Sequence, residues 1–224
     1  MSDAIISTTF ELWIKYLIVI EPQLDYTDIE VLSRRYDWDA YPEVELDYLS
    51  RLFAKPIESI EGYSDAQINK GLWTIVSDWT HCLFDKNLPL ESRVKTLKHT
   101  YTVFEQLFAP RCTPDTSAYR MEVDEHMNPL NSICYMWWDV IPLYGKSGDP
   151  NREVLDPCCI EVMERTLQLN SIACQESALH GLGHWARAYP EKVQPIIDAY
   201  LTREKNLLPD LRDYALAARR GAVL

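Results

Sequence analysis

Glycine is scarce in this 224-residue sequence, and the cysteines show no pattern. Seven glycines and thirteen prolines leave few positions for the tight turns of strand-rich folds. No segment shows the alternation of apolar and polar residues that marks a half-buried strand. The six cysteines contain no C-x-x-C pair and follow no disulfide-scaffold spacing. These features disfavour a β-rich fold and a disulfide framework, and they predict reduced thiols in a cytoplasmic protein.

The first 22 residues, MSDAIISTTFELWIKYLIVIEP, contain no long apolar run. They have neither the basic start nor the small-residue cleavage site of a signal peptide. Glu11 and Lys15 interrupt the apolar residues, which are too few in succession to span a bilayer. We therefore expect no signal peptide and no membrane association.

Basic residues are also few: 22 Lys and Arg stand against 34 Asp and Glu, a net charge of −12. Nucleic acids and anionic membrane surfaces both require a basic footprint, so neither is expected as a partner. The excess is concentrated in residues 1–65, where 14 acidic residues face 5 basic ones. A concentrated negative field steers cationic proteins toward their binding site.

What the sequence does contain is a 3.6-residue apolar period along almost its whole length. Its hydrophobic content of 47% and charged content of 25% are those of a globular protein. The pattern predicts an all-α fold of stacked antiparallel helical hairpins, forming one domain over residues 1–224 with a candidate seam at the 142–153 loop. The predicted helices cover residues 4–20, 27–36, 42–54, 64–84, 89–109, 118–139, 153–169, 171–188, 190–205 and 208–220.

The C-terminal third carries the most specific resemblance. The stretch NSIACQESALHGLGHWARAYPEKVQPIIDAYLTREKNLLPDLRDYALAARRGAVL resembles HEAT-type helical repeats over residues 153–220. Small residues and leucines would fill an inner helix, and Pro190 would open the next one. The string AYPE occurs at 40–43 and again at 188–191, which could reflect a repeat or simply a common way to open a helix. The resemblance implies a HEAT-like α-solenoid.

The segment ESALHGLGHWARA has the only arrangement typical of a metal or catalytic site. Glu176, His180 and His184 are spaced four residues apart, so a helix would place them in one stripe with Arg187 nearby. A helical projection puts this stripe opposite the apolar residues. The stripe could line a polar groove, or the two histidines could bind a metal with a carboxylate as third ligand. The chain has no His-Glu dipeptide of the kind that binds metal in HEAT-repeat deoxyhypusine hydroxylases. We therefore expect no metal or cofactor.

Gly181 and Gly183 lie within the same predicted helix, where each costs about 1 kcal/mol relative to Ala. We interpret them as positions where a neighbouring helix approaches closely. The chain has no G-x-S-x-G nucleophile motif, and no catalytic residue is assigned.

The stretch YDWDAYPEVELDY, residues 36–48, contains carboxylates and aromatic rings without a basic residue. One interpretation is a partly buried helix junction whose acidic residues are ordinary solvated side chains. The other is a binding surface for a basic partner, in which the carboxylates attract the partner and the aromatic rings anchor it. The second interpretation assigns the partner-binding residues as Asp37, Trp38, Asp39, Tyr41, Glu43, Glu45 and Asp47.

Together these patterns favour a non-catalytic protein-binding module. Small acidic helical proteins of this kind are similar to immunity proteins, which occlude basic toxins such as nucleases. The resemblance implies a basic protein partner whose cationic cleft would receive the carboxylates. The alternatives are a metal-dependent enzyme centred on Glu176, His180 and His184, or a general scaffold protein.

Overall fold

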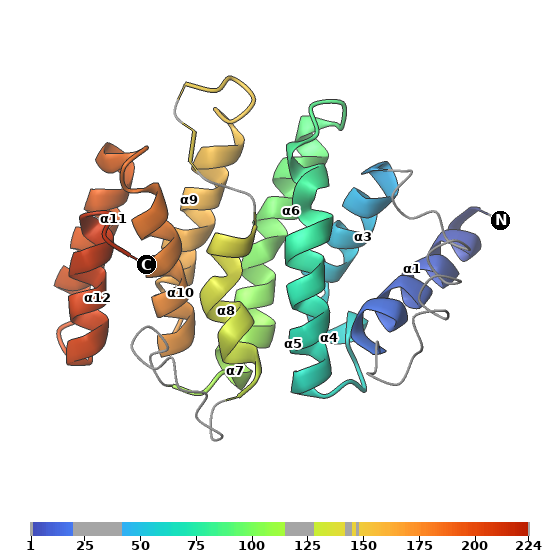
Figure 1. Ribbon diagram of the computed structural model, residues 1–224, viewed down its shortest axis with the longest axis horizontal. Coiled ribbons are helices and arrows are strands. Elements are labelled where there is room, and N and C mark those ends of the chain that lie inside the picture. Colours follow the sequence, from blue (N-terminus) through green and yellow to red (C-terminus); the bar gives the residue numbers. More distant parts are fainter. Residues whose placement is uncertain (1, 20–41, 115–127, 142–144, 147, 224) are drawn as a thin grey trace.

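The computed structural model of the chain describes residues 2–19, 42–114, 128–141, 145–146 and 148–223. Within these ranges every regular element is a helix and no strand occurs. Figure 1 shows the helices following one another across the molecule, from the N-terminal end to the C-terminal end. The all-α class predicted from the apolar period is therefore confirmed.

The helices are short to medium in length, and two of them change type before they end. A π-turn and a 3₁₀ segment extend α5 to Phe84, and a π-turn joins α6 to α7. Their bounds are α1 Ser2–Val19, α3 Pro42–Ala54, α4 Pro56–Ser59, α5 Asp65–Thr74, α6 Leu90–Val103, α7 Ala109–Arg111, α8 Leu130–Val140, α9 Leu155–Thr166, α10 Ile172–Trp185, α11 Pro190–Arg203 and α12 Pro209–Arg219.

The prediction of a helix over residues 118–139 is wrong at residues 128 and 129, the first of these residues that the structure describes. Residues 128–129 are not helical, and α8 begins only at Leu130. The residue before a proline is disfavoured in the helical conformation, and Pro129 follows Asn128. The Asn128 side chain instead accepts a hydrogen bond from the Leu130 backbone N–H at 2.9 Å. The predicted helix at 27–36 lies outside the described residues.

Contacts between helices define two sets of neighbours. In one set α1 contacts α5, α5 contacts α8, α8 contacts α10 and α10 contacts α12. In the other, α3 contacts α6, α6 contacts α9 and α9 contacts α11. Successive helices of the chain thus alternate between the sets, apart from the short α4 and α7. The α6–α9 and α8–α10 contacts join the helices on either side of the 142–153 loop.

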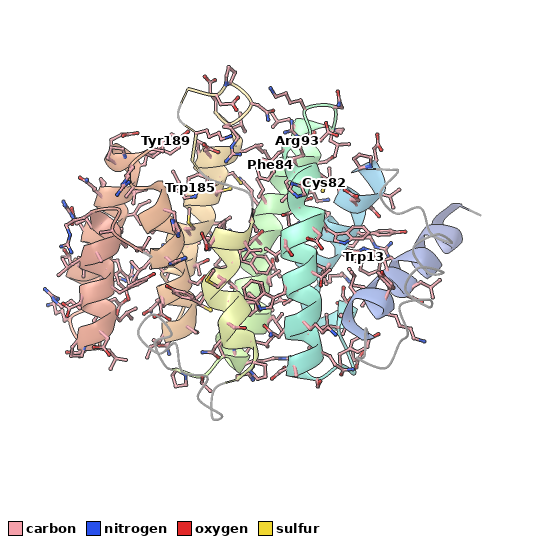
Figure 2. All side chains as sticks on the ribbon, viewed as in Figure 1. Trp13, Cys82, Phe84, Arg93, Trp185 and Tyr189 are labelled. Atoms are coloured by element: carbon pink, nitrogen blue, oxygen red, sulfur yellow. The ribbon has the colours of Figure 1, made fainter. Side chains whose placement is uncertain are left out.

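Aromatic side chains form much of the core between the two sets. Trp137 and Trp138 of α8 are both buried, and Phe104 lies 5.8 Å from the first ring and 6.1 Å from the second, measured between ring centroids. Figure 2 shows Trp13 and Trp185, also fully buried, toward opposite ends of the molecule. The core therefore runs along the whole array. All six cysteines are free thiols, and five are buried.

Both glycines of α10 lie where a neighbour approaches closely, as predicted. A Cβ at Gly181 would lie 2.7 Å from Trp138 Cγ and 2.6 Å from Met163 Sδ. At Gly183 it would lie 2.6 Å from a methyl group of Val223, beyond the end of α12. Real Cβ atoms essentially never show such distances, so α10 can pack this closely only because these side chains are absent.

A capping box starts α5, as the Ser64-x-x-Gln67 pattern predicts. The Ser64 hydroxyl accepts from the Gln67 backbone N–H at 3.4 Å, and the Gln67 side chain accepts from the Ser64 backbone N–H at 3.0 Å. We expect Ser64→Ala to lower the free energy of unfolding by about 1 kcal/mol, measured by urea denaturation. Ser77→Ala is the control, because Ser77 is exposed inside a helix and caps nothing. Equal effects of the two substitutions would contradict this role for Ser64.

Candidate functional site

Helix α10 is central to the C-terminal half of the molecule. It begins after Ser171, whose hydroxyl accepts from the Cys174 backbone N–H at 3.4 Å. It contacts α8, α9, α11 and α12. Glu176 and His180 are completely buried, as are Ala178, Leu179, Leu182 and Trp185 of the same helix. The predicted polar face is therefore wrong at Glu176 and His180, because a helical projection assumes one face toward solvent and α10 has neighbours on both sides.

The two histidines of α10 meet a carboxylate from α8. His180 Nε2 lies 3.1 Å from His184 Nε2, and His184 Nε2 lies 3.5 Å from Asp139 Oδ1. One ligand atom from each of the three residues lies within 4.8 Å of the other two. Among the described residues, this is the one group of three or more His, Cys, Asp or Glu side chains with that geometry.

Two tyrosines hold the buried side of this cluster. The Tyr214 hydroxyl of α12 lies 2.6 Å from His180 Nδ1 and 3.0 Å from the Tyr135 hydroxyl of α8. The Tyr135 ring also lies against His180, with 4.5 Å between ring centroids. Both ring nitrogens of His180 are therefore engaged, Nδ1 by Tyr214 and Nε2 by His184, and three helices fix the orientation of the imidazole.

Burial also controls the charge of His180. Removal from water is the main cause that lowers the pKa of His180 to about 4, and the adjacent His184 adds to the shift. Burial disfavours the charged imidazolium because little solvent remains to stabilise it. His180 is consequently neutral near pH 7, with one ring nitrogen protonated and the other bearing a lone pair.

The structure brings together only two of the four residues predicted to form one stripe, which were Glu176, His180, His184 and Arg187. His180 and His184 do meet, but Asp139 supplies the carboxylate of the cluster and Glu176 is not part of it. Arg187 is exposed and lies beyond the end of α10. Four-residue spacing identifies neighbours on one helix only, whereas Asp139 comes from a different helix. The sole sequence signal for Asp139 was its position after two tryptophans, which marks a helix that packs into the core.

The acidic stretch is described only from α3 onward. Asp37, Trp38, Asp39 and Tyr41 lie outside the described residues. On α3, Glu43 and Asp47 are exposed and Glu45 is half-buried. Asp47 also lies 3.9 Å from Arg51.

The aromatic residue that ends the stretch, Tyr48, belongs to the core. Its ring lies 5.6 Å from Phe10 and 5.4 Å from Trp13, measured between centroids. The described part of the stretch therefore combines exposed carboxylates with one buried ring.

A groove follows α3 on the outside of the molecule. Between α3 and α6 a hollow of about 300 Å³ is lined by Glu43 and Asp47, among others. A larger hollow of about 630 Å³ lies between α1, α3 and the α4 region. The two share Asp47, Ser50 and Lys95, so they form one continuous depression. We call this depression the α3 groove.

No protein-family model, curated protein or solved structure matches this chain. Among the described residues, no helix has the length and apolar character needed to cross a membrane.

Proposed function

We propose that this protein is a non-catalytic binding module that occludes a basic protein partner, as an immunity protein occludes a toxin nuclease. The two sets of alternating helices would be the layers of a HEAT-like solenoid of antiparallel hairpins. Repeat folds of this type place function on an extended surface because each repeat adds to one continuous face.

The α3 groove is the observation that carries the proposal. Two of the acidic residues assigned to partner binding, Glu43 and Asp47, line it with exposed carboxylates. The remaining assigned residues of the acidic stretch directly precede α3 or lie on it. A groove at this position can receive a basic loop or helix, and its carboxylates can occupy the place of phosphates in a cationic cleft.

Two of the basic side chains that line the groove, Arg51 and Lys55, have acidic or aromatic neighbours. Arg51 lies 3.9 Å from Asp47, and its guanidinium lies 4.0 Å from the centroid of the Phe10 ring. Lys55 donates to Glu58 at 2.8 Å. Such exposed pairs are weak, so an incoming cationic group can compete for these carboxylates at little energetic cost.

The test removes the charge and keeps the shape. In Glu43→Gln/Asp47→Asn the acids of the groove become isosteric amides. With a partner captured from an extract of the native cell and then purified, we expect association to slow by about tenfold at low salt. The association rate should also depend less on salt concentration, because the variant has fewer charges for the salt to screen. Stopped-flow or surface-based kinetics measures both quantities.

Glu191→Gln/Asp210→Asn is the matched control, since it removes the same charge from exposed positions on α11 and α12. It should leave association nearly unchanged. Equal slowing by both variants would mean that only net charge matters. Unchanged kinetics in the groove variant, or a captured partner that is itself acidic, would overturn the proposal.

A further inference from the structure

The cluster of Asp139, His180 and His184 has the dimensions of a metal site. A tetrahedral zinc ion with bonds of about 2.0–2.2 Å places its ligand atoms about 3.3–3.5 Å apart. Two of the three separations are 3.1 Å between the two Nε2 atoms and 3.5 Å between His184 Nε2 and Asp139 Oδ1, and the third is within 4.8 Å. Small side-chain movements would therefore suffice to coordinate an ion.

The two Nε2 atoms that face each other, those of His180 and His184, can each offer a lone pair to a metal ion. His180 Nδ1 is held 2.6 Å from the Tyr214 hydroxyl. When Nδ1 carries the ring proton and donates it to Tyr214, Nε2 presents its lone pair toward His184 and Asp139. A hydrogen bond at the second ring nitrogen, which fixes the tautomer and orientation, is the usual outer-shell arrangement of metal-binding histidines.

The cluster is accessible to solvent on one side. His180 is completely buried, whereas the side chains of His184 and Asp139 are 22% and 33% exposed. An ion would thus be held from the interior by His180 and reached from solvent past the other two ligands. Structural zinc sites have four protein ligands, while catalytic sites have three and leave one position for water or substrate.

We propose that Asp139, His180 and His184 bind a divalent transition-metal ion of the Zn²⁺ class, with the fourth coordination position open to water. In the metal-free protein the 3.1 Å separation is a hydrogen bond between the two imidazoles, so one Nε2 carries a proton. To bind the ion, the histidine that carries this proton must adopt its other tautomer, with the proton on Nδ1, so that Nε2 presents its lone pair. Tyr214 is a positioning residue, because it touches His180 and not the ion.

This inference goes beyond partner binding at the α3 groove. The metal ligands come from α8 and α10, whereas α1, α3, α4 and α6 provide most of the groove lining. A variant of either site can therefore be assayed without disturbing the other. Failure of one proposal leaves the other standing.

The experiment uses the full chain, stripped with chelator and titrated with Zn²⁺ alone. We expect one ion per chain by calorimetry and by elemental analysis after gel filtration. His184→Gln and Asp139→Asn should each weaken binding by more than the 10–100-fold typical of losing an outer-shell partner, and Tyr214→Phe should weaken it by about 10–100-fold. His81→Gln is the control, because His81 is an exposed histidine on a different helix.

Cobalt distinguishes this cluster from the cysteines. Co²⁺ bound by two imidazoles and a carboxylate should show visible d–d absorption without the strong near-ultraviolet charge-transfer band of thiolate ligation. Far-UV circular dichroism confirms that each variant is folded, and the partly exposed positions 139 and 184 provide two independent ligand variants. Absence of binding, equal affinity of His184→Gln and His81→Gln, or a thiolate band would each overturn the proposal.

Discussion

Asp156→Asn is expected to lower the free energy of unfolding by about 3–5 kcal/mol, the usual cost of breaking a buried ion pair from one side. Asp156 is completely buried, and Arg152 is nearly so. One carboxylate oxygen accepts from Arg152 Nε at 2.6 Å. The other accepts from the Lys146 backbone N–H and from the Tyr189 hydroxyl, each at 2.9 Å.

An amide cannot replace this carboxylate, although it has the same shape. All three partners donate hydrogen bonds, so the NH₂ group of Asn would face a donor, and Arg152 would lose its buried ion pair with residue 156. The guanidinium also lies over the Phe84 ring, 4.7 Å from its centroid. Figure 2 shows Phe84 and Tyr189 along the same edge of the molecule. The network thus links the 142–153 loop to α9 and to the turn before α11.

Urea denaturation followed by tryptophan fluorescence measures the effect. Asp198→Asn is the control, because Asp198 forms a two-point ion pair with Arg219 at 2.6 and 2.8 Å in an exposed position, where water screens the charges. Its loss of stability should be much smaller. The double variant Arg152→Met/Asp156→Leu should be more stable than Asp156→Asn, since it leaves no unpaired charge. Similar losses for Asp156→Asn and Asp198→Asn would contradict this account.

Gly181→Leu is expected to lower the free energy of unfolding by about 3 kcal/mol, at the upper end of what overpacking costs. Even a single Cβ would lie 2.7 Å from Trp138 Cγ and 2.8 Å from Trp138 Cβ. The Met163 thioether is flexible and can turn away, but the indole is packed against Phe104 and cannot. The larger side chain must therefore push α10 away from α8.

Gly181→Ala provides a graded comparison. Alanine gains about 1 kcal/mol of helix propensity over glycine, so its net effect should be smaller than that of leucine. Ala199→Leu is the control at an exposed position of α11, and it should change stability little. Thermal unfolding monitored by circular dichroism gives the ranking. A stabilised Gly181→Leu protein would show that α8 and α10 do not pack as described.

The same substitution should weaken the metal site, because α8 carries Asp139 and α10 carries both histidines. Separation of the helices lengthens the distance between His184 Nε2 and Asp139 Oδ1. Zinc affinity therefore offers a second measurement of the packing at Gly181 that does not depend on global stability.

The sequence alone determined the features that depend on near neighbours in the chain. A period of 3.6 residues identified the helices because side chains on one face of a helix recur at that spacing. The Ser64-x-x-Gln67 pattern identified the start of α5, since both of its hydrogen bonds join residues three apart. Gly181 and Gly183 indicated close packing, because glycine inside a helix is costly unless another helix occupies the space.

Only the tertiary structure decided the environment of α10. The spacing of Glu176, His180 and His184 is a local property and put them in one stripe. Whether that stripe faces water depends on helices that are distant in sequence. Asp139 joins the histidines solely because α8 packs against α10, and no periodicity relates residue 139 to residue 180. Burial of His180 and its contact with Tyr214 likewise depend on the position of α12, which is separated from α10 in the sequence by α11.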